Sequence, residues 1–467
     1  MSTQPTLEQI VALAKRRGFV YPTSDIYGGL ANSYDYGPVG IELLKNIRDA
    51  WWQYFITRRP DMVGLQSQIL LHPQTWVASG HVEAFHDPLV EDLVTHKRFR
   101  VDHIIENWLS KKAKDLNLEM LVVEDMDLDE MTALIKKYQI SSPDGNQLTK
   151  PKRFSLLFQT QIGSVTGEKS TVYLRGETAQ GIFTNFKNVL DSTRIQLPFG
   201  VGNIGTSFRN EVTTGQFVFR TLEFELAEIE YFFDPQKEDW QQLMTKWKDQ
   251  MWKFATEILG INDKNLKWRQ HTDKERSHYS LDTWDLDFNF PFGYKELWGI
   301  AYRTDFDLKQ HQKFSGQNME YTDPHTQRKF IPHVIEPAVG LARFFLMTLC
   351  DAYWDDKENK RIVLKLKSNL APYKAAVFPL AKNKPELVAK AKEIFDDLSQ
   401  KYHVAWDDRS SIGKRYLYQD EIGTPCCITI DYETLEDNTV TARDRDTTQQ
   451  IRLPLTELAD YLKNKIE

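Results

Sequence analysis

The stretch "SFRNEVTTGQFVFRTLEFELAEIE" (residues 207–230) decides the fold, because it threads charges through an apolar, strand-like run. It holds two arginines, Arg209 and Arg220, and five glutamates among Phe, Leu, Val and Ile. Residues 204–212 and 218–233 alternate as strands do, and "TTGQF" between them has the length of a hairpin loop. The segment therefore predicts two antiparallel strands that carry charged side chains.

The side chains of these strands are expected on defined faces. If the second strand is unbroken, Arg220, Phe224 and Glu228 point the same way, and Arg209 and Glu211 share a face of the first strand. A charge ladder on a solvated sheet face is one interpretation. The apolar neighbours of Glu228 favour another, in which this carboxylate is buried and needs a cation as its partner.

A second element is "PHVIEPAVGLARFFLMTL" (332–349), which predicts a strand, a break at Pro337 and Gly340, and an apolar helix. Arg343 falls in the first turn of that helix, where a positive charge opposes the helix dipole. The arginine is therefore expected to bind a specific anion, although a core helix with an incidental arginine is the simpler alternative.

The composition describes a folded protein of several domains. The chain has 467 residues, of which 41% are hydrophobic and 27% charged. Its formal net charge of -7 does not exclude a local basic groove for RNA. Only three cysteines occur, Cys350, Cys426 and Cys427, so neither a disulfide framework nor a zinc site is expected. No apolar run is long enough for a membrane helix, and a cytoplasmic protein fits best.

Several further elements can be placed along the chain. Residues 40–56 predict an amphipathic helix, with one apolar face made of Ile41, Leu44, Ile47, Trp51 and Phe55. A strand is expected to follow and to stop at Pro73. Residues 106–155 are mostly helical in pattern, and 240–259 predict another helix. Beyond a charged connector at 351–362, strands and helices alternate as in a separate α/β domain, over 374–379, 385–401, 402–407, 425–431 and 439–443.

These motifs, taken in order, resemble a known family. "FRNE", Phe224, Gly340 and Arg343 look like motifs 2 and 3 of class II aminoacyl-tRNA synthetases, and the helix and strand ending at Pro73 are similar to motif 1. More narrowly, "YDYGPVG", "SGHVEAFHDPLV", "FRVDH", "ETAQGIFTNF", "GTSFRNE", "YRTDFDL" and "VIEP" resemble the glycyl-tRNA synthetases of the dimeric type. The resemblance covers nearly the whole chain.

The resemblance implies an α+β fold: the class II synthetase antiparallel sheet flanked by helices, with a C-terminal α/β anticodon-binding domain. The implied division is a catalytic core in three parts, two insertions and the anticodon-binding domain. The core spans 1–105 (motif 1), 156–235 (motif 2) and 285–355 (motif 3). The insertions span 106–155 (mainly helical) and 236–284 (with a helix), and the anticodon-binding domain spans 362–467.

The implied activity is that of an ATP-dependent ligase. It would activate glycine as glycyl adenylate, with release of pyrophosphate, and transfer it to the 3′ end of tRNA(Gly). Both steps build up negative charge, which the planar guanidinium group of arginine suits. Arg209 would hold the α-phosphate and the attacking carboxylate, and Arg343 the γ-phosphate, so these two are the expected catalytic residues. Mg²⁺ would accompany ATP and would be held by Glu296.

The resemblance also implies the contacts of each substrate. The residues expected at ATP are Arg209, Asn210, Glu211, Phe219, Arg220, Phe224, Glu296, Leu297, Gly340 and Arg343. Those expected at glycine are Arg100, Glu177, Glu228, Arg303, Glu336 and Ala338. The three glutamates of this set would surround the ammonium group. A homodimer through the motif 1 region is expected, and no membrane partner.

Two positions depart from the family pattern, since Ala338 stands where serine is usual and Gly176 where proline is usual. The first removes a hydroxyl that would face glycine. His81, a lone histidine, is more often a structural group than a catalyst. Arg415, Tyr416 and Arg443 are weak candidates for anticodon contacts.

Two alternative functions remain open on the sequence. One is a binding or regulatory protein that keeps the synthetase fold, which the presence of Arg209, Glu211 and Arg343 argues against. The other is a class II synthetase for serine, threonine or proline, against which the three glutamates and "ETAQGIF" favour glycine.

Overall fold

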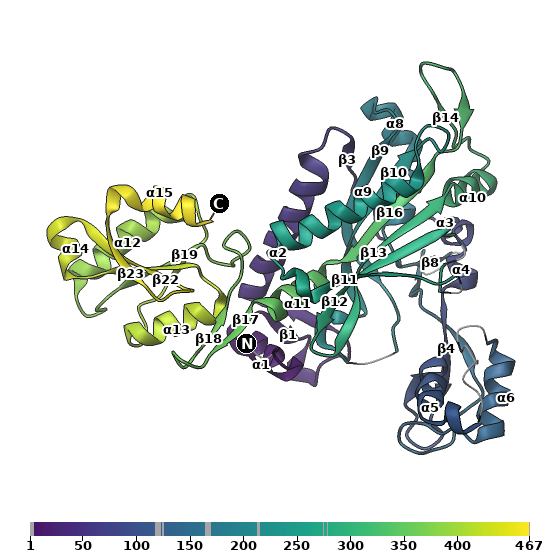
Figure 1. Ribbon diagram of the computed structural model, residues 1–467, viewed down its shortest axis with the longest axis horizontal. Helices are drawn as coiled ribbons and strands as arrows, with labels where there is room; N and C mark the ends of the chain where they lie inside the picture. The colour runs from purple at the N-terminus through teal and green to yellow at the C-terminus, as the bar shows by residue number, and fades with distance from the viewer. Residues whose placement is uncertain are drawn as a thin grey trace.

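The computed structural model describes residues 4–116, 123, 126–163, 170–212, 215–273, 275–277 and 279–466. Figure 1 shows a large central body, a C-terminal α/β domain on the left, and a compact unit at the lower right that contains α5 and α6. Over the described residues, no helix is both long and apolar enough to cross a membrane.

A seven-stranded sheet forms the centre of the body. The strands lie in the order β11-β12-β13-β16-β10-β9-β3, and every neighbouring pair is antiparallel except β3 with β9. Their bounds are β3 Met62–Gly64, β9 Phe199–Phe208, β10 Glu223–Phe233, β11 Leu266–Gln270, β12 Asp282–Phe290, β13 Gly293–Thr304 and β16 His333–Gly340. The expected antiparallel sheet with flanking helices is confirmed.

Alternation divides this sheet into a helix-covered face and a face that carries the polar residues. On β10, Ala227, Ile229 and Tyr231 belong to the main hydrophobic core, whereas Glu228 and Glu230 point to the other side. The helices that contribute to that core include α2 Pro38–Trp52, α9 Trp240–Lys253 and α11 Leu341–Ala352. The functional side chains therefore lie on the face that these helices do not cover.

The predicted helices at 40–56 and 240–259 are confirmed, each with one π-helical turn at its end, over Gln53–Thr57 and Phe254–Ile258. The predicted apolar face of the first is right except at Ile41, which is 47% exposed. Phe55 lies against Trp298 of the sheet, with ring centroids 5.4 Å apart.

Three strand expectations were wrong in their limits. β9 ends at Phe208 and β10 begins only at Glu223, because residues 217–219 form a 3₁₀ turn after Gln216, which has a φ of 67°. Arg209, Glu211 and Arg220 therefore lie on the connection between the strands and not on strand faces. Pro73 does not end a strand but begins the helix α3 Pro73–Ala78, as a first helical residue needs no N–H partner.

The compact unit at the lower right has its own small core, built from Val90, Ile105, Met131 and their neighbours. It contains the expected helices and a three-stranded sheet that the sequence did not reveal. Its elements are β4 His86–Glu91, β5 Arg98–Arg100, α5 Val101–Leu116, α6 Leu128–Tyr138 and β6 Lys152–Ser155. An acidic stretch, "EDMDLDEM", covers residues 124–131, of which 124 and 125 lie outside the described part. Its Asp127 caps α6.

The C-terminal domain has a five-stranded sheet in the order β20-β19-β21-β22-β23, in which β19 runs parallel to β20 and β21. The predicted alternation is confirmed. Its elements are β19 Ala375–Pro379, α12 Pro385–Ser399, β20 Val404–Trp406, α13 Ile412–Ile422, β21 Cys426–Ile430, α14 Tyr432–Asp437, β22 Thr439–Asp444, β23 Gln450–Pro454 and α15 Leu455–Ile466. Arg16 and Arg17 of α1 Leu7–Arg17 bind Glu421 of α13 at 2.9 and 2.5 Å and tie the domain to the body.

The remaining elements are short or lie at the edges of the body. They are β1 Val20–Pro22, β2 Tyr34–Tyr36, α4 His81–Ala84, β7 Gln159–Ile162, β8 Ser170–Tyr173, α7 Ala179–Thr184, α8 Phe186–Thr193, α10 Phe306–Ser315, β14 Tyr321–Thr322, β15 Lys329–Phe330, β17 Tyr353–Asp356 and β18 Arg361–Leu364.

Candidate active site

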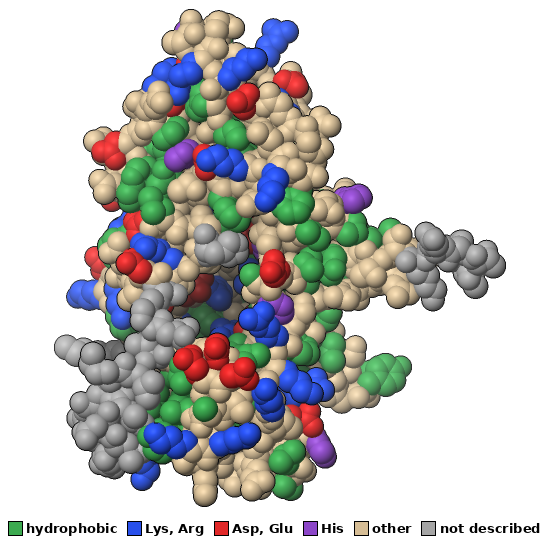
Figure 2. All heavy atoms as spheres, turned by 90° about the vertical axis from the view of Figure 1, so that its right-hand side faces the viewer, with side chains coloured by type: hydrophobic (Ala, Val, Ile, Leu, Met, Phe, Trp, Pro, Cys, Tyr) green, Lys and Arg blue, Asp and Glu red, His purple; other side chains and the backbone are tan. Residues whose placement is uncertain are grey.

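A cavity of about 320 Å³ opens on the polar face of the sheet, a size typical of small-molecule sites. Figure 2 shows a hollow on this side of the molecule, with acidic and basic side chains around it. Of the sequence-predicted residues, those that line the cavity are Arg100, Arg209, Glu211, Phe219, Arg220, Phe224, Glu228, Glu296, Ala338, Gly340 and Arg343. The cavity is thus built mainly from β10, β16, the start of α11 and the β9–β10 connection.

Arg209 is fixed in direction by rings and by one backbone contact. Its guanidinium carbon lies 5.3 Å from the ring centroid of Phe85 and 5.5 Å from that of Phe224. Its Nε donates to the carbonyl of Gly176 at 3.2 Å, so its other nitrogens remain available to an anion in the cavity. A guanidinium held between aromatic faces is positioned without a carboxylate partner.

Arg343 has an anionic partner in Glu296. Its Nη1 lies 2.8 Å from a carboxylate oxygen of Glu296 and donates to the Glu296 carbonyl at 3.0 Å. Desolvation acts to raise the pKa of Glu296, but the charges of Arg343 and Arg209 outweigh it and leave this pKa below its ordinary value. Both side chains therefore enter the cavity charged.

Arg100 and Arg220 complete the basic side of the cavity. Arg100 binds Asp87 at 3.0 Å and Asp102 at 2.6 Å. Arg220 lies 3.9 Å from Glu211 on the β9–β10 connection.

The acidic side of the cavity is formed by Glu228. This residue is 3% exposed, and its Oε2 accepts a hydrogen bond from the backbone N–H of Thr178 at 2.5 Å and another from the Thr178 hydroxyl. Burial, followed by the charge of Glu177, raises the pKa of Glu228. The interpretation of Glu228 as a buried carboxylate is therefore right, and the solvated charge ladder is wrong.

A layer of charges lies directly behind Glu228. Arg303, 1% exposed, donates to Asp307 at 2.8 and 2.9 Å and to both oxygens of Glu336 at 2.9 Å. Glu177 accepts from Gln180 at 2.9 Å and lies 3.3 Å from His81 Nε2. His81 in turn contacts the Ser79 hydroxyl at 2.8 Å, which fits a structural role for this histidine.

Five predicted site residues do not line the cavity: Asn210, Leu297, Glu177, Arg303 and Glu336. The last three are buried behind it, and Leu297 is fully buried. The remaining lining residues were not among the predicted site residues, and they are Asp87, Leu156, Val218, Thr221, Leu226 and Ala342. Asp87 stands in the motif "SGHVEAFHDPLV", so the motif carried a signal for it.

Of the candidates for anticodon contacts in the C-terminal domain, Arg415 and Arg443 are buried and Tyr416 is partly buried. Arg415, 3% exposed, donates to the carbonyls of Pro379, Asp408, Arg409 and Ser410. Arg443 is bound by Asp420, and the Tyr416 hydroxyl contacts Thr429. These three side chains make hydrogen bonds within the domain, which fits a structural role.

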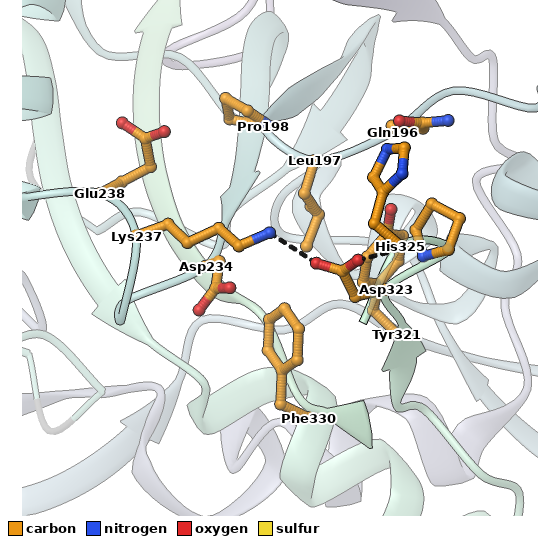
Figure 3. A pocket seen from close by; sticks show the side chains of 11 residues that line it. Gln196, Leu197, Pro198, Asp234, Lys237, Glu238, Tyr321, Asp323, His325 and Phe330 are labelled. Carbon is orange, nitrogen blue, oxygen red and sulfur yellow. Dashed lines mark hydrogen bonds and ion pairs between the residues drawn. The ribbon is translucent and has the colours of Figure 1, made fainter. Parts of the chain in front are cut away.

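A second, smaller cavity of about 50 Å³ lies beside the β14–β15 hairpin. Figure 3 shows Lys237 reaching Asp323 across it, at 2.5 Å, with Asp234 and Phe330 nearby. Arg328 also binds Asp234. This cavity is too small for a nucleotide, and the ion pairs Lys237–Asp323 and Arg328–Asp234 fasten the hairpin to the end of β10.

Comparison with known proteins gives one consistent result. Residues 374–465 match the family described as "Anticodon binding domain". The glycine–tRNA ligase of Staphylococcus haemolyticus is 47% identical over 470 aligned positions, covering 98% of this chain and 99% of the relative. Those of Bacillus cereus and Caldanaerobacter subterraneus subsp. tengcongensis are each 46% identical, over 99% and 100% of this chain. The chain therefore belongs to the glycine–tRNA ligase family, within the class II aminoacyl-tRNA synthetases.

Proposed function

We propose that this protein joins glycine to the 3′ end of tRNA(Gly) with the consumption of ATP. The observation that carries the proposal is the lining of the cavity, in which four arginines, Arg100, Arg209, Arg220 and Arg343, meet the buried carboxylate Glu228, with further buried carboxyls nearby. A glycine zwitterion fits between them with its ammonium toward Glu228 and its carboxylate toward Arg209. Ala338 stands opposite Glu228 on β16 and also lines the cavity.

In the first step, a carboxylate oxygen of glycine attacks the α-phosphorus of ATP, and the bond to the bridging oxygen breaks to release pyrophosphate. Arg209 reaches the α-phosphate and the attacking carboxylate together, so it lowers their mutual repulsion and aligns them. Arg343 takes the γ-phosphate, exchanging Glu296 for a phosphate oxygen. Phe224 offers its ring, and Glu211 its carboxylate, to the adenine.

Glu296 is the residue proposed to hold Mg²⁺. Over the described residues, no group of three or more His, Cys, Asp or Glu side chains could hold a metal ion by itself. Mg²⁺ commonly uses one or two carboxylates and completes its shell with phosphate oxygens and water. Asp287, opposite Glu296 on β12, has a buried Oδ1 with no hydrogen-bond partner and fits as a second acidic neighbour. When bound, the ion neutralises charge on the phosphates.

In the second step, a terminal ribose hydroxyl of the tRNA attacks the carbonyl carbon of glycyl adenylate, and AMP leaves. The C-terminal domain supplies the anticodon contact. Lys382, Lys384 and Arg409 are exposed and follow the ends of the parallel strands β19 and β20, where ligands of α/β sheets commonly bind. They replace the buried Arg415 and Arg443 as the proposed contacts.

The active unit is proposed to be a homodimer that contacts through the motif 1 region. Ile26 and Tyr27, close to α2 in the chain, are 87% and 86% exposed. Two neighbouring large apolar side chains in water favour a covering partner. Ile26→Asp with Tyr27→Ser is expected to shift the sedimenting species from dimer to monomer, whereas a wild-type monomer at micromolar concentration would contradict the proposal. The three cysteines are free and buried, which fits a cytoplasmic location.

The function is tested by amino-acid-dependent exchange of labelled pyrophosphate into ATP, with Mg²⁺ and without tRNA. Glycine, alanine, serine, threonine and proline are offered separately. Exchange with glycine alone is expected. Exchange with a different amino acid would reassign the substrate, and no exchange with any would favour a binding protein.

A further inference from the structure

Five carboxyl groups are buried together behind the amino-acid end of the cavity. They are Glu177, Glu228, Glu230, Asp307 and Glu336, with exposures of 6%, 3%, 0%, 2% and 6%. Three of them share one sheet face, because Glu228 and Glu230 are two residues apart on β10. In the same register, Ala338 of β16 pairs with Glu228, so Glu336 stands opposite Glu230.

The guanidinium group within this cluster already has carboxylate partners. Arg303 donates from Nε and Nη2 to Asp307 and from Nη1 to Glu336. Within the described part of the chain, the hydrogen bonds to Glu228 come from the N–H and hydroxyl of Thr178. Among the same residues, neither oxygen of Glu230 has a hydrogen-bond partner. The sheet face thus holds three carboxyls, Glu228, Glu230 and Glu336. The guanidinium of Arg303 serves this face and also Asp307.

An unpaired carboxylate cannot stay ionised at such a position, since protonation costs less than burial of the bare charge. Burial, with Glu336 next in effect, raises the pKa of Glu230 well above its ordinary value. Burial also raises the pKa of Glu336, to about 8, against the opposing charge of Arg303. Glu230 is therefore neutral, and Glu228 with Glu336 retains part of a second proton at neutral pH.

We propose, on the basis of the proposed function, that the ammonium group of glycine displaces a proton shared by Glu228 and Glu336, while Glu230 keeps its own. The exchange balances: one carboxylic acid O–H breaks, the proton leaves to the solvent, and the carboxylate that remains pairs with the incoming ammonium. Glycine binding is then linked to proton release. After the proton has left, the cluster carries one more negative charge, which the ammonium group of glycine neutralises.

The other groups around the cluster do not supply this proton. The pKa of Glu177 is lowered, because His81 and Arg303 outweigh its burial, so Glu177 is already ionised. Burial lowers the pKa of His311, behind Gln180, and raises that of Tyr279, which lies against Arg303. Asp307 is held by two nitrogens of Arg303. From the opposite wall, Arg209 faces Glu228 and favours its ionised form.

Calorimetric titration of the full-length protein with glycine at pH 7 tests the proposal. The same titration is run in phosphate, HEPES and Tris, and the slope of binding enthalpy against buffer ionisation enthalpy counts the protons. Free glycine is a zwitterion throughout and adds none. We expect release of about 0.5 to 1 proton per glycine. Saturable binding with zero slope, or with proton uptake, would overturn the proposal, whereas no saturable binding would overturn the proposed function itself.

Glu230→Gln is the matched variant, because glutamine has the shape of the neutral acid and cannot ionise. The number of protons released per glycine should equal that of the wild type within error, and the glycine affinity should stay within about twofold of the wild-type value. Loss of proton release in this variant would overturn the assignment to Glu228 and Glu336. If the variant does not fold, the wild-type enzyme still decides: its KM for glycine should fall as the pH rises from 6 to 8, by up to about tenfold per pH unit. A flat profile would contradict the proposal.

Discussion

Replacement of Arg303 by methionine should destabilise the catalytic body and abolish glycine activation. The variant leaves Asp307 and Glu336 buried without a cation. Breaking a buried ion pair from one side costs about 3 to 5 kcal/mol. If Asp307 takes up a proton instead, the cost at pH 7.5 is capped at about 5 kcal/mol, at 1.36 kcal/mol per pH unit above the ordinary pKa of an aspartic acid. Glu336 adds little to this cost, because its pKa is already raised to about 8 in the wild type.

The same reasoning fixes how the loss depends on pH. Without Arg303, Asp307 stays buried only as the neutral acid, so the destabilisation grows as the pH rises and shrinks as it falls. Between pH 7.5 and pH 5.5, this carboxyl recovers about 2.7 kcal/mol if it is protonated throughout. The variant should therefore regain a large part of its lost stability at pH 5.5.

Urea unfolding followed by tryptophan fluorescence measures this, because Trp51, Trp247 and Trp298 are buried in the main core. Arg98→Met is the control, since Arg98 is 57% exposed and only 3.6 Å from Glu91, and it should change the free energy of unfolding by less than about 1 kcal/mol. A loss below about 1 kcal/mol in Arg303→Met, or an equal loss at both pH values, would refute the account of the cluster.

Three further outcomes are expected. Ala338→Ser should change the KM for glycine modestly, by less than about tenfold, and leave the KM for ATP intact; complete loss of pyrophosphate exchange would contradict the role given to this position. Glu296→Gln should lower kcat by at least about tenfold and raise the Mg²⁺ concentration needed for half-maximal exchange, and an unchanged Mg²⁺ dependence would remove Glu296 from the metal site. Arg415→Ala should lower the midpoint of urea unfolding of the C-terminal domain, because four carbonyls lose their donor. Arg409→Ala, at a side chain that is 84% exposed, should weaken tRNA binding and leave that midpoint unchanged. The reverse pattern would restore Arg415 as an RNA contact.

The parts of the site that follow a local repeat could be predicted from the sequence. Phe224 and Glu228 are four residues apart on one strand, so the period of two places both on the cavity face. Arg343 stands in the first turn of α11, and its unfavourable place against the dipole indicated an anion.

The parts that depend on strand limits and irregularities could not be predicted. Alternation gave no sign that β9 stops at Phe208, so Arg209 and Glu211 were placed on a strand face. Arg303 falls at a register shift between Tyr302 and Thr304 in the pairing of β13 with β16. A one-residue shift redirects a side chain, and this irregularity accompanies the burial of Arg303 behind the cavity.

The position of β16 in the sheet has a consequence for synthesis of the chain. β9 and β10 are consecutive strands that pair with each other, as are β12 and β13, but β16 lies between the two pairs. About 100 residues separate the end of β10 from the start of β16, which takes about 5 to 20 s at the usual rates of translation. During that interval the inner edges of β10 and β13 expose unpaired N–H and C=O groups, the kind of edge that recruits other chains. Nascent chains are therefore most open to aggregation just before β16 emerges, and the strand that brings Glu336 and Ala338 to the cavity is also the one that closes the sheet.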